Sequence, residues 1–191
     1  AVGAHAVGKL SDDELIGMEK AACPGCGSCS GMYTANSMNC LCEAIGLALP
    51  GNGSIPAVTG ARLRLAKEAG EKVMELLEKG IKPLDILTED AIENAIRTDM
   101  AIGCSSNTVL HLTAVAHAAG RDITLADFDR VGKATPQICK LNPAGSTFIV
   151  DLDGVGGITA VMKELARGGL LNTDCLTVSG TVAEKIESAA D

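Results

Sequence analysis

Residues 23–51 read CPGCGSCSGMYTANSMNCLCEAIGLALPG. This stretch combines a cluster of five cysteines with a clear helix signal. From Met32 to Leu49 apolar side chains recur every three or four residues, which is the spacing of one buried helix face. The proline–glycine pair at 50–51 ends this helix. Residues 23–31 are almost all cysteine, glycine and serine, so they predict a loop that leads into the helix N-terminus.

The same periodicity predicts about eight helices in all. Ser11 and Glu14 form a capping box at the start of one of them, and Thr88 and Thr181 are suitable caps for two others. In the expected helix 57–79, Leu63, Ala66, Val73, Leu76 and Leu77 share one face, which we expect to be core. The other expected helices cover residues 11–22, 88–102, 108–119, 124–132, 153–168 and 181–190, and short strands are expected at 137–141, 147–150 and 176–178. We therefore predict a mainly α fold with up to three short strands.

Charge and composition limit the possible functions. The chain has 24 acidic and 16 basic residues, for a net charge of −8, and its Lys and Arg residues do not cluster beyond isolated pairs. This pattern argues against binding to nucleic acid or to an anionic membrane. Residues 1–10 lack the pattern of a signal peptide. Five of the eight cysteines lie between residues 23 and 42, which in an acidic chain without a visible signal indicates cytoplasmic thiols with metal or redox chemistry.

The cysteine loop has the spacing C-x2-C-x2-C at Cys23, Cys26 and Cys29. A helix N-terminus stabilises negative charge, and the thiolate is the form of cysteine that binds metal. A ferredoxin-type run needs a fourth cysteine followed by proline, whereas the next cysteine, Cys40, lies inside the expected helix. Three cysteines without an evident fourth indicate an incomplete site whose other ligands lie elsewhere. Two alternatives to this interpretation remain open. The three thiols form a self-standing iron–sulfur or redox module, or they are incidental thiols packed in a helical binding domain.

The longer string ACPGCGSCSGMYTANSMN at residues 22–39, followed by LPGNGSIP at 49–56, closely resembles the dihydroxy-acid/6-phosphogluconate dehydratase family and favours its dihydroxy-acid branch. GCSSNTVLHL at residues 103–112 is similar to a second glycine-serine-asparagine loop of that family. The resemblance extends from about Ser11 to Asp174.

The resemblance implies that residues 1–191 are one segment of a larger α/β N-terminal domain. The family's Cys-Asp-Lys motif and its C-terminal domain are absent from this chain. The resemblance implies that the catalytic base belongs to that C-terminal domain. The implied reaction removes water from a 2,3-dihydroxy acid to give a 2-keto acid, in the biosynthesis of the branched-chain amino acids valine and isoleucine. No catalytic residue is expected within residues 1–191, so the isolated segment is predicted to be inactive.

The resemblance also implies cofactors and partners. Cys29 is the expected ligand of an iron–sulfur cluster, whereas Cys23 and Cys26 are not assigned as ligands. Both common cluster types use thiolates, and we expect [2Fe–2S] in preference to [4Fe–4S]. Mg²⁺ is expected to be held by ligands outside this segment. The expected partners are a small dihydroxy acid, the remainder of the same polypeptide and a second copy in a homodimer.

Two further loops have two possible roles each. Ser105, Ser106 and Asn107 stand at the start of an expected helix, where they either bind a substrate anion or only cap the helix. The turn at residues 50–56 is either structural or lines the site. If one site uses both small-residue loops, residues 23–31 and 103–107 should lie close together on one side of the molecule.

Overall fold

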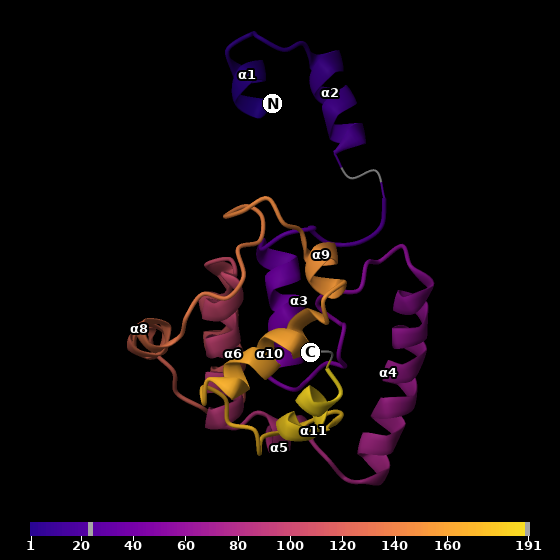
Figure 1. Ribbon diagram of the computed structural model, residues 1–191. Coiled ribbons are helices and arrows are strands. Elements are labelled where there is room, and N and C mark those ends of the chain that lie inside the picture. Colours follow the sequence, from indigo (N-terminus) through magenta and orange to yellow (C-terminus); the bar gives the residue numbers. More distant parts are fainter. Residues whose placement is uncertain (23–24, 190–191) are drawn as a thin grey trace.

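Three helices pack against one another at the centre of the molecule: α3 (Thr34–Ala44), α6 (Glu89–Ile102) and α10 (Gly157–Arg167) (Figure 1). The structure is a computed structural model that describes residues 1–22 and 25–189. Apolar faces of the three helices form the core, and their most deeply buried side chains include Leu41, Ile92, Ile96, Ile158 and Met162. This burial is the main source of stability for helices that are marginal on their own.

Shorter elements surround this centre. α7 (Asn107–Ala118) contacts α3 and α6, α8 (Leu125–Ala134) contacts α6, and α9 (Ile149–Asp153) and α11 (Val182–Glu187) contact α10. The remaining elements are α1 (Val2–Ala6), α2 (Asp12–Ala21), α4 (Gly60–Glu78), α5 (Pro83–Ile86), β1 (Leu176–Thr177) and β2 (Gly180–Thr181). β1 and β2 pair antiparallel, with Leu176 opposite Thr181. The described residues thus contain eleven helices and one two-stranded sheet, which confirms the predicted mainly α class.

Helix ends follow the capping signals of the sequence. At α2 the Ser11 side chain accepts a hydrogen bond from the Glu14 backbone N–H, and the Glu14 carboxylate accepts one from the Ser11 N–H. At α6 the Thr88 hydroxyl accepts from the Ala91 N–H at 3.1 Å. Gly103 ends α6 in the left-handed conformation, with φ of 68°, where a residue with a Cβ would be strained.

Several predicted boundaries are wrong. Residues 147–150 do not form a strand, because the Phe148 N–H donates to the Asp151 carboxylate at 2.7 Å and this cap starts α9. Residues 137–141 form only an isolated bridge, between Leu141 and Thr147. The helix expected at 32–49 ends at Ala44, and the one expected at 153–168 begins at Gly157, after a turn that places Gly156 at φ of 102°. The short helices α1 and α5 were not predicted.

The predicted core face of α4 is wrong as well. Leu63, Val73 and Leu77 are 74%, 59% and 72% exposed, and Leu65 is the buried residue of this helix. Figure 1 shows why: α4 runs along one side of the central helices instead of being enclosed by them. The apolar period identifies a face, but it does not identify what covers that face.

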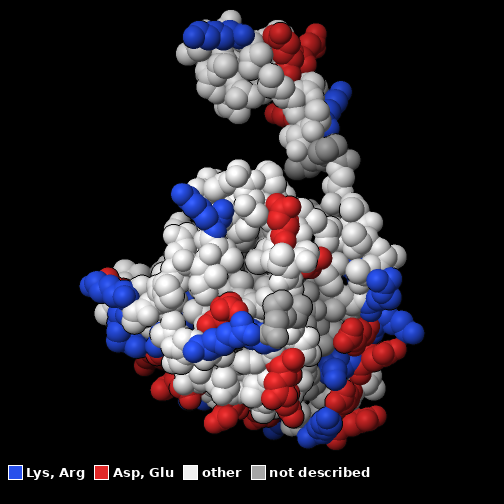
Figure 2. Space-filling model, viewed as in Figure 1, with Lys and Arg blue, Asp and Glu red and all other residues white. Residues whose placement is uncertain are grey.

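The outer parts of the molecule carry most of the charge. On the face seen in Figure 2, Lys and Arg are interspersed with Asp and Glu along the lower edge and over the side formed by α4. α1 and α2 stand apart from the central helices in Figure 1. None of the helices in the described part of the chain is both long enough and apolar enough to span a bilayer.

Candidate functional site

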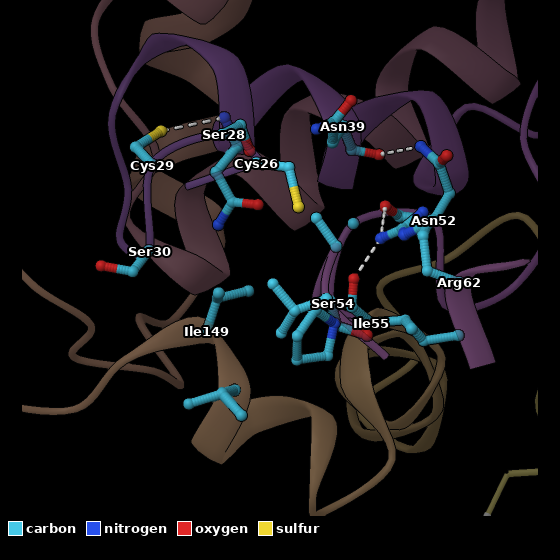
Figure 3. A pocket seen from close by; sticks show the side chains of 17 residues that line it. Cys26, Ser28, Cys29, Ser30, Asn39, Asn52, Ser54, Ile55, Arg62 and Ile149 are labelled. Atoms are coloured by element: carbon cyan, nitrogen blue, oxygen red, sulfur yellow. Dashed lines mark hydrogen bonds between the residues drawn. The ribbon is translucent and has the colours of Figure 1, made fainter. Parts of the chain in front are cut away.

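Cys29 lies against the N-terminus of α3. Its Sγ atom accepts a hydrogen bond from the backbone N–H of Asn36 at 3.2 Å (Figure 3). Asn36 is the third residue of α3, so this N–H belongs to the first turn, whose amides have no acceptor within the helix. The positive end of the helix dipole adds to the attraction for negative charge. The start of α3 therefore provides a directed donor for a metal-bound cysteine sulfur.

The loop that carries Cys29 is fixed by the segment at 142–149. The Met32 N–H donates to the Asn142 carbonyl at 2.7 Å, and the Ile149 N–H donates to the Ser30 carbonyl at 2.9 Å. The Tyr33 hydroxyl donates to the Asn142 side-chain oxygen at 2.8 Å. These bonds bring α9 to the loop, so the first residues of α9 face the same space as Cys29.

This space is a cavity of about 390 Å³ beside Cys29. Figure 3 shows Cys29 and Asn39 on one side of it, Asn52, Ser54 and Arg62 on another, and Ile149 below. Four segments line it: the cysteine loop at 26–30, α3 through Asn36 and Asn39, the turn and the start of α4 at 52–58 and 62, and α9 through Ile149 and Val150. The cavity has the size of a small-molecule site. Of the two roles considered for the turn at 50–56, lining the cavity beside Cys29 is the one that residues 52–56 fill.

The turn at 51–55 is held by a buried carboxylate. Glu43, fully buried on α3, accepts hydrogen bonds from the backbone N–H groups of Gly51 at 3.0 Å and Gly53 at 3.4 Å, and from the Thr159 hydroxyl at 3.0 Å. Burial raises the pKa of Glu43, although the nearby charge of Lys185 and these hydrogen bonds oppose that rise. The Lys185 ammonium donates to the Glu43 carbonyl at 2.7 Å. One residue therefore ties the cavity wall to two helices: the Glu43 carboxylate accepts from Thr159 on α10, and its backbone carbonyl accepts from Lys185 on α11.

Arg62 holds the same turn from its outer side. Its guanidinium donates to the carbonyl of Asn52 at 3.0 Å and also to the carbonyl of Ile55. The charged group lies at the edge of the cavity (Figure 3), so it adds positive potential to a wall made otherwise of small polar and apolar groups.

The second small-residue loop also reaches the first turn of α3. The Ser105 N–H donates to the Ser37 hydroxyl at 3.0 Å, and the Cys104 sulfur lies 4.0 Å from the Met32 sulfur. Because Ser37 directly follows Asn36, the second loop lies against the same helix start that the cysteine loop leads into, on the side that the proximity prediction requires.

The predicted binding residues of this second loop do not lie at the cavity. The residues that line the cavity do not include Ser105, Ser106 or Asn107. The Ser105 hydroxyl accepts from the Asn107 amide at 2.8 Å, and Ser106 is exposed. The first of these contacts is typical of a local turn, and a role in substrate binding stays a prediction.

The other cysteines differ from Cys29. Burial raises the pKa of the Cys40 thiol, which lies 3.7 Å from the Gly53 carbonyl oxygen. Burial, together with the Asp99 carboxylate, raises the pKa of Cys104. Burial thus favours the protonated form of both thiols in this structure.

Only two cysteines of the triplet, Cys26 and Cys29, lie within the described residues. Cys26 is exposed at the edge of the cavity, and Cys23 lies outside the described residues. Within residues 1–22 and 25–189, no group of three or more Cys, His, Asp or Glu side chains is placed to hold a metal ion. Cys29 and its N–H donor are therefore not part of a complete metal-binding set within these residues.

Sequence reasoning missed Asn36, Arg62 and Glu43 as parts of this site. Asn36 lies four residues before Cys40, so the two residues share one face of the helix. A polar residue on a face that is otherwise apolar signals a buried polar group. Arg62 lies in the first turn of α4, where a positive charge opposes the helix dipole, so this placement also signals a specific contact. Glu43 had no comparable signal, because its partners at 159 and 185 are distant in sequence.

Comparison with known proteins identifies the family of the chain. A family model described as "Dihydroxy-acid/6-phosphogluconate dehydratase N-terminal" matches residues 1–185. The dihydroxy-acid dehydratase of Moorella thermoacetica is 58% identical over 187 residues, which are 97% of this chain and 34% of the relative. The enzymes of the same name from Carboxydothermus hydrogenoformans and Agathobacter rectalis are 58% and 55% identical, each over 100% of this chain and 34% of the relative. The chain thus spans about a third of the length of the curated relatives it matches. With a matching family model over nearly its whole length and more than half of its residues identical to these relatives, the chain belongs to the dihydroxy-acid/6-phosphogluconate dehydratase family.

Proposed function

We propose that this chain is the cluster-bearing segment of a dihydroxy-acid dehydratase, which removes water from a 2,3-dihydroxy acid to give a 2-keto acid in branched-chain amino-acid biosynthesis. The observation that carries the proposal is the placement of Cys29: its sulfur accepts from the Asn36 N–H at the start of α3 and faces a cavity of about 390 Å³. The high identity to dehydratases of this name supports the choice of substrate class.

In this proposal, Cys29 contributes one sulfur ligand to an iron–sulfur cluster, with [2Fe–2S] favoured over [4Fe–4S]. When bound, the cluster supplies a Lewis-acidic iron that takes up the charge of the departing 3-hydroxyl. The Asn36 N–H orients the Cys29 sulfur, and the turn held by Glu43 and Arg62 shapes the opposite wall of the cavity.

The remaining parts of the site belong elsewhere. Mg²⁺ ligands and the base that removes the 2-proton would come from the rest of the polypeptide, and a second copy would complete a homodimer in the cytoplasm. Because one thiolate holds a cluster weakly and no base is assigned within residues 1–191, the isolated segment should show no dehydratase activity.

The test compares cysteine variants of the full-length protein that contains this segment, each purified anaerobically. Cys29→Ser should lose iron, sulfide and activity, because an alcohol is rarely deprotonated near neutral pH and is a poor replacement for a soft thiolate. Cys26→Ala and Cys23→Ala serve as matched controls and should keep the cluster. Iron and acid-labile sulfide are quantified in each variant, together with 2-keto acid production.

If Cys26→Ala or Cys23→Ala loses iron as completely as Cys29→Ser, the single-ligand assignment is wrong. The chain would then be a module that uses Cys23, Cys26 and Cys29 together. Full iron and sulfide content in Cys29→Ser would contradict both interpretations.

A further inference from the structure

The side chain of Asn36 ends in a buried amide that lacks an acceptor. Asn36 is 3% exposed and lines the cavity beside Cys29, and its Nδ2 atom has no hydrogen-bond partner among the described residues. Buried amides in native proteins are nearly always paired, so an orphaned donor at a cavity needs a physical explanation. A group that binds in the cavity would provide the acceptor.

Other asparagines in this chain show that pairing is the rule. Asn94, which is fully buried, donates to the Asn172 carbonyl at 2.9 Å and accepts from the Asn172 N–H at 2.9 Å. Asn52, on the cavity wall, donates to the Asn39 carbonyl at 3.1 Å. The other buried side-chain nitrogen without a partner in the described part is on Arg97, whose guanidinium is already engaged with Glu93 at 2.7 Å. The neutral amide of Asn36 therefore stands out by its place at the cavity.

The backbone of the same residue indicates what kind of acceptor fits. The backbone N–H of Asn36 already donates to the Cys29 sulfur. The side-chain amide is a second donor of the same residue, and its short side chain keeps it near the first. The Nδ2 atom is buried, so its acceptor would be a group that fills the cavity beside Cys29 and not bulk water. Cluster sulfur atoms are resident, carry negative charge and accept hydrogen bonds from amides.

We propose that the Asn36 side-chain amide donates a hydrogen bond to a sulfur atom of the cluster bound through Cys29, and thereby raises the reduction potential of the cluster and slows its loss. The inference rests on the proposed function, because it requires a cluster at Cys29. It makes Asn36 a positioning residue that acts on the cofactor from the first turn of α3.

The experiment uses the full-length protein with Asn36→Leu, which has nearly the same size but no amide. The midpoint potential is measured by redox titration followed by electron paramagnetic resonance, and iron release to a chelator is followed by absorbance. We expect a more negative midpoint potential, because the lost donor stabilises the more electron-rich reduced cluster. We also expect iron release to be roughly tenfold faster or more, as for other changes around metal ligands.

Asn39→Leu is the matched control, since Asn39 lies one turn further along α3 and lines the same cavity. It should leave the potential and the release rate unchanged. Asn36→Ala, which adds no bulk and suits a helix, is measured in parallel so that a misfolded Asn36→Leu does not decide the result.

Unchanged potential and release rate in the Asn36 variants would overturn the inference. An equal shift in Asn39→Leu would also overturn it, because the effect would then reflect general cavity polarity. A raised KM for the dihydroxy acid with an unchanged potential would assign the amide to a substrate oxygen and equally overturn it. Absence of iron and sulfide from the unsubstituted protein would overturn the proposed function, and this inference with it.

Discussion

Asp99 is a buried carboxyl group beneath the second small-residue loop. The Thr108 hydroxyl lies 3.0 Å from both of its oxygens, and the Cys104 thiol also hydrogen-bonds to it. Burial outweighs these contacts and raises the pKa of Asp99 to about 6. The residue thus makes the stability of this end of α6 depend on pH.

Asp99→Asn should remove part of that dependence. The folded pKa of about 6 lies above the unfolded value of about 3.9, so the folded state holds its proton more tightly and stability is lost as pH rises from about 4 to about 6. The free energy of unfolding falls by about 3 kcal/mol over this pH range and does not fall further above about pH 6 for this reason. Asparagine stays neutral, so the variant should gain stability relative to the unsubstituted segment between pH 4 and pH 7. Urea unfolding at each pH, followed by circular dichroism, measures the difference, and a constant difference across the range would contradict the prediction.

At the scale of elements, the approach of the turn at 51–55 to α3 depends on one glycine. A Cβ atom at Gly53 would lie 2.6 Å from the Cys40 Cα and 2.8 Å from its Sγ. The Cα belongs to the backbone of a central helix, which moves only at a cost, so the turn and its cavity-lining residues would be displaced. A close packing contact, not a left-handed backbone, thus requires glycine here.

Gly53→Ala should lower the free energy of unfolding by about 1–3 kcal/mol, the usual cost of overpacking. Gly70→Ala is the matched control: it lies within α4, a Cβ atom there would have open space within 4 Å, and the added methyl should stabilise the helix by roughly 0.5–1 kcal/mol. Chemical denaturation of both variants gives the comparison. Equal stability of Gly53→Ala and the unsubstituted segment would show that α3 and the turn can separate at little cost.

Local signals predicted the elements best. The caps at Ser11, Thr88 and Thr181 mark helix starts because each satisfies N–H groups within three residues. The same logic applied to Asp151 identifies α9, but the short β-branched and aromatic run at 147–150 favours a strand and hides this cap. The Cys29 loop is predictable as the entry to a helix. Its contacts with the segment at 142–149 were not predictable, because they join residues more than a hundred positions apart.

At the scale of the whole molecule, α4 leaves an apolar stripe uncovered. Leu63, Val73, Met74 and Leu77 repeat at helical spacing along its length, and each is more than half exposed. Leu63, Val73 and Leu77 of the predicted face lie in this stripe, whereas Leu76 is half-buried. Burial of the stripe would need contacts that the described residues do not make. An uncovered stripe of this length favours association in water.

The isolated segment should therefore self-associate as its concentration rises. Leu63→Lys combined with Leu77→Lys should weaken this association by roughly tenfold or more, since each change removes about 1.5–3 kcal/mol of apolar burial from an interface. Sedimentation velocity across a concentration series measures the effect. Leu110→Lys on α7 is the control, because Leu110 is 70% exposed but lies on a different helix. An equal effect of the control would assign the association to another surface.

The buried carboxylate of Glu43 also has a consequence for the order in which the protein is made. Its partners on the turn at 51–53 follow within ten residues, whereas Thr159, which donates to the carboxylate, lies 116 positions later in the chain. Lys185, which donates to the Glu43 backbone carbonyl, lies 142 positions later. During translation the N-terminal parts leave the ribosome first, so α3 and the cysteine loop emerge long before α10 and α11 exist. We expect the Glu43 carboxylate to stay partly hydrated until Thr159 of α10 is available to bond it. Loading of the proposed cluster on the nascent chain would thus have to wait until α10 has been synthesised.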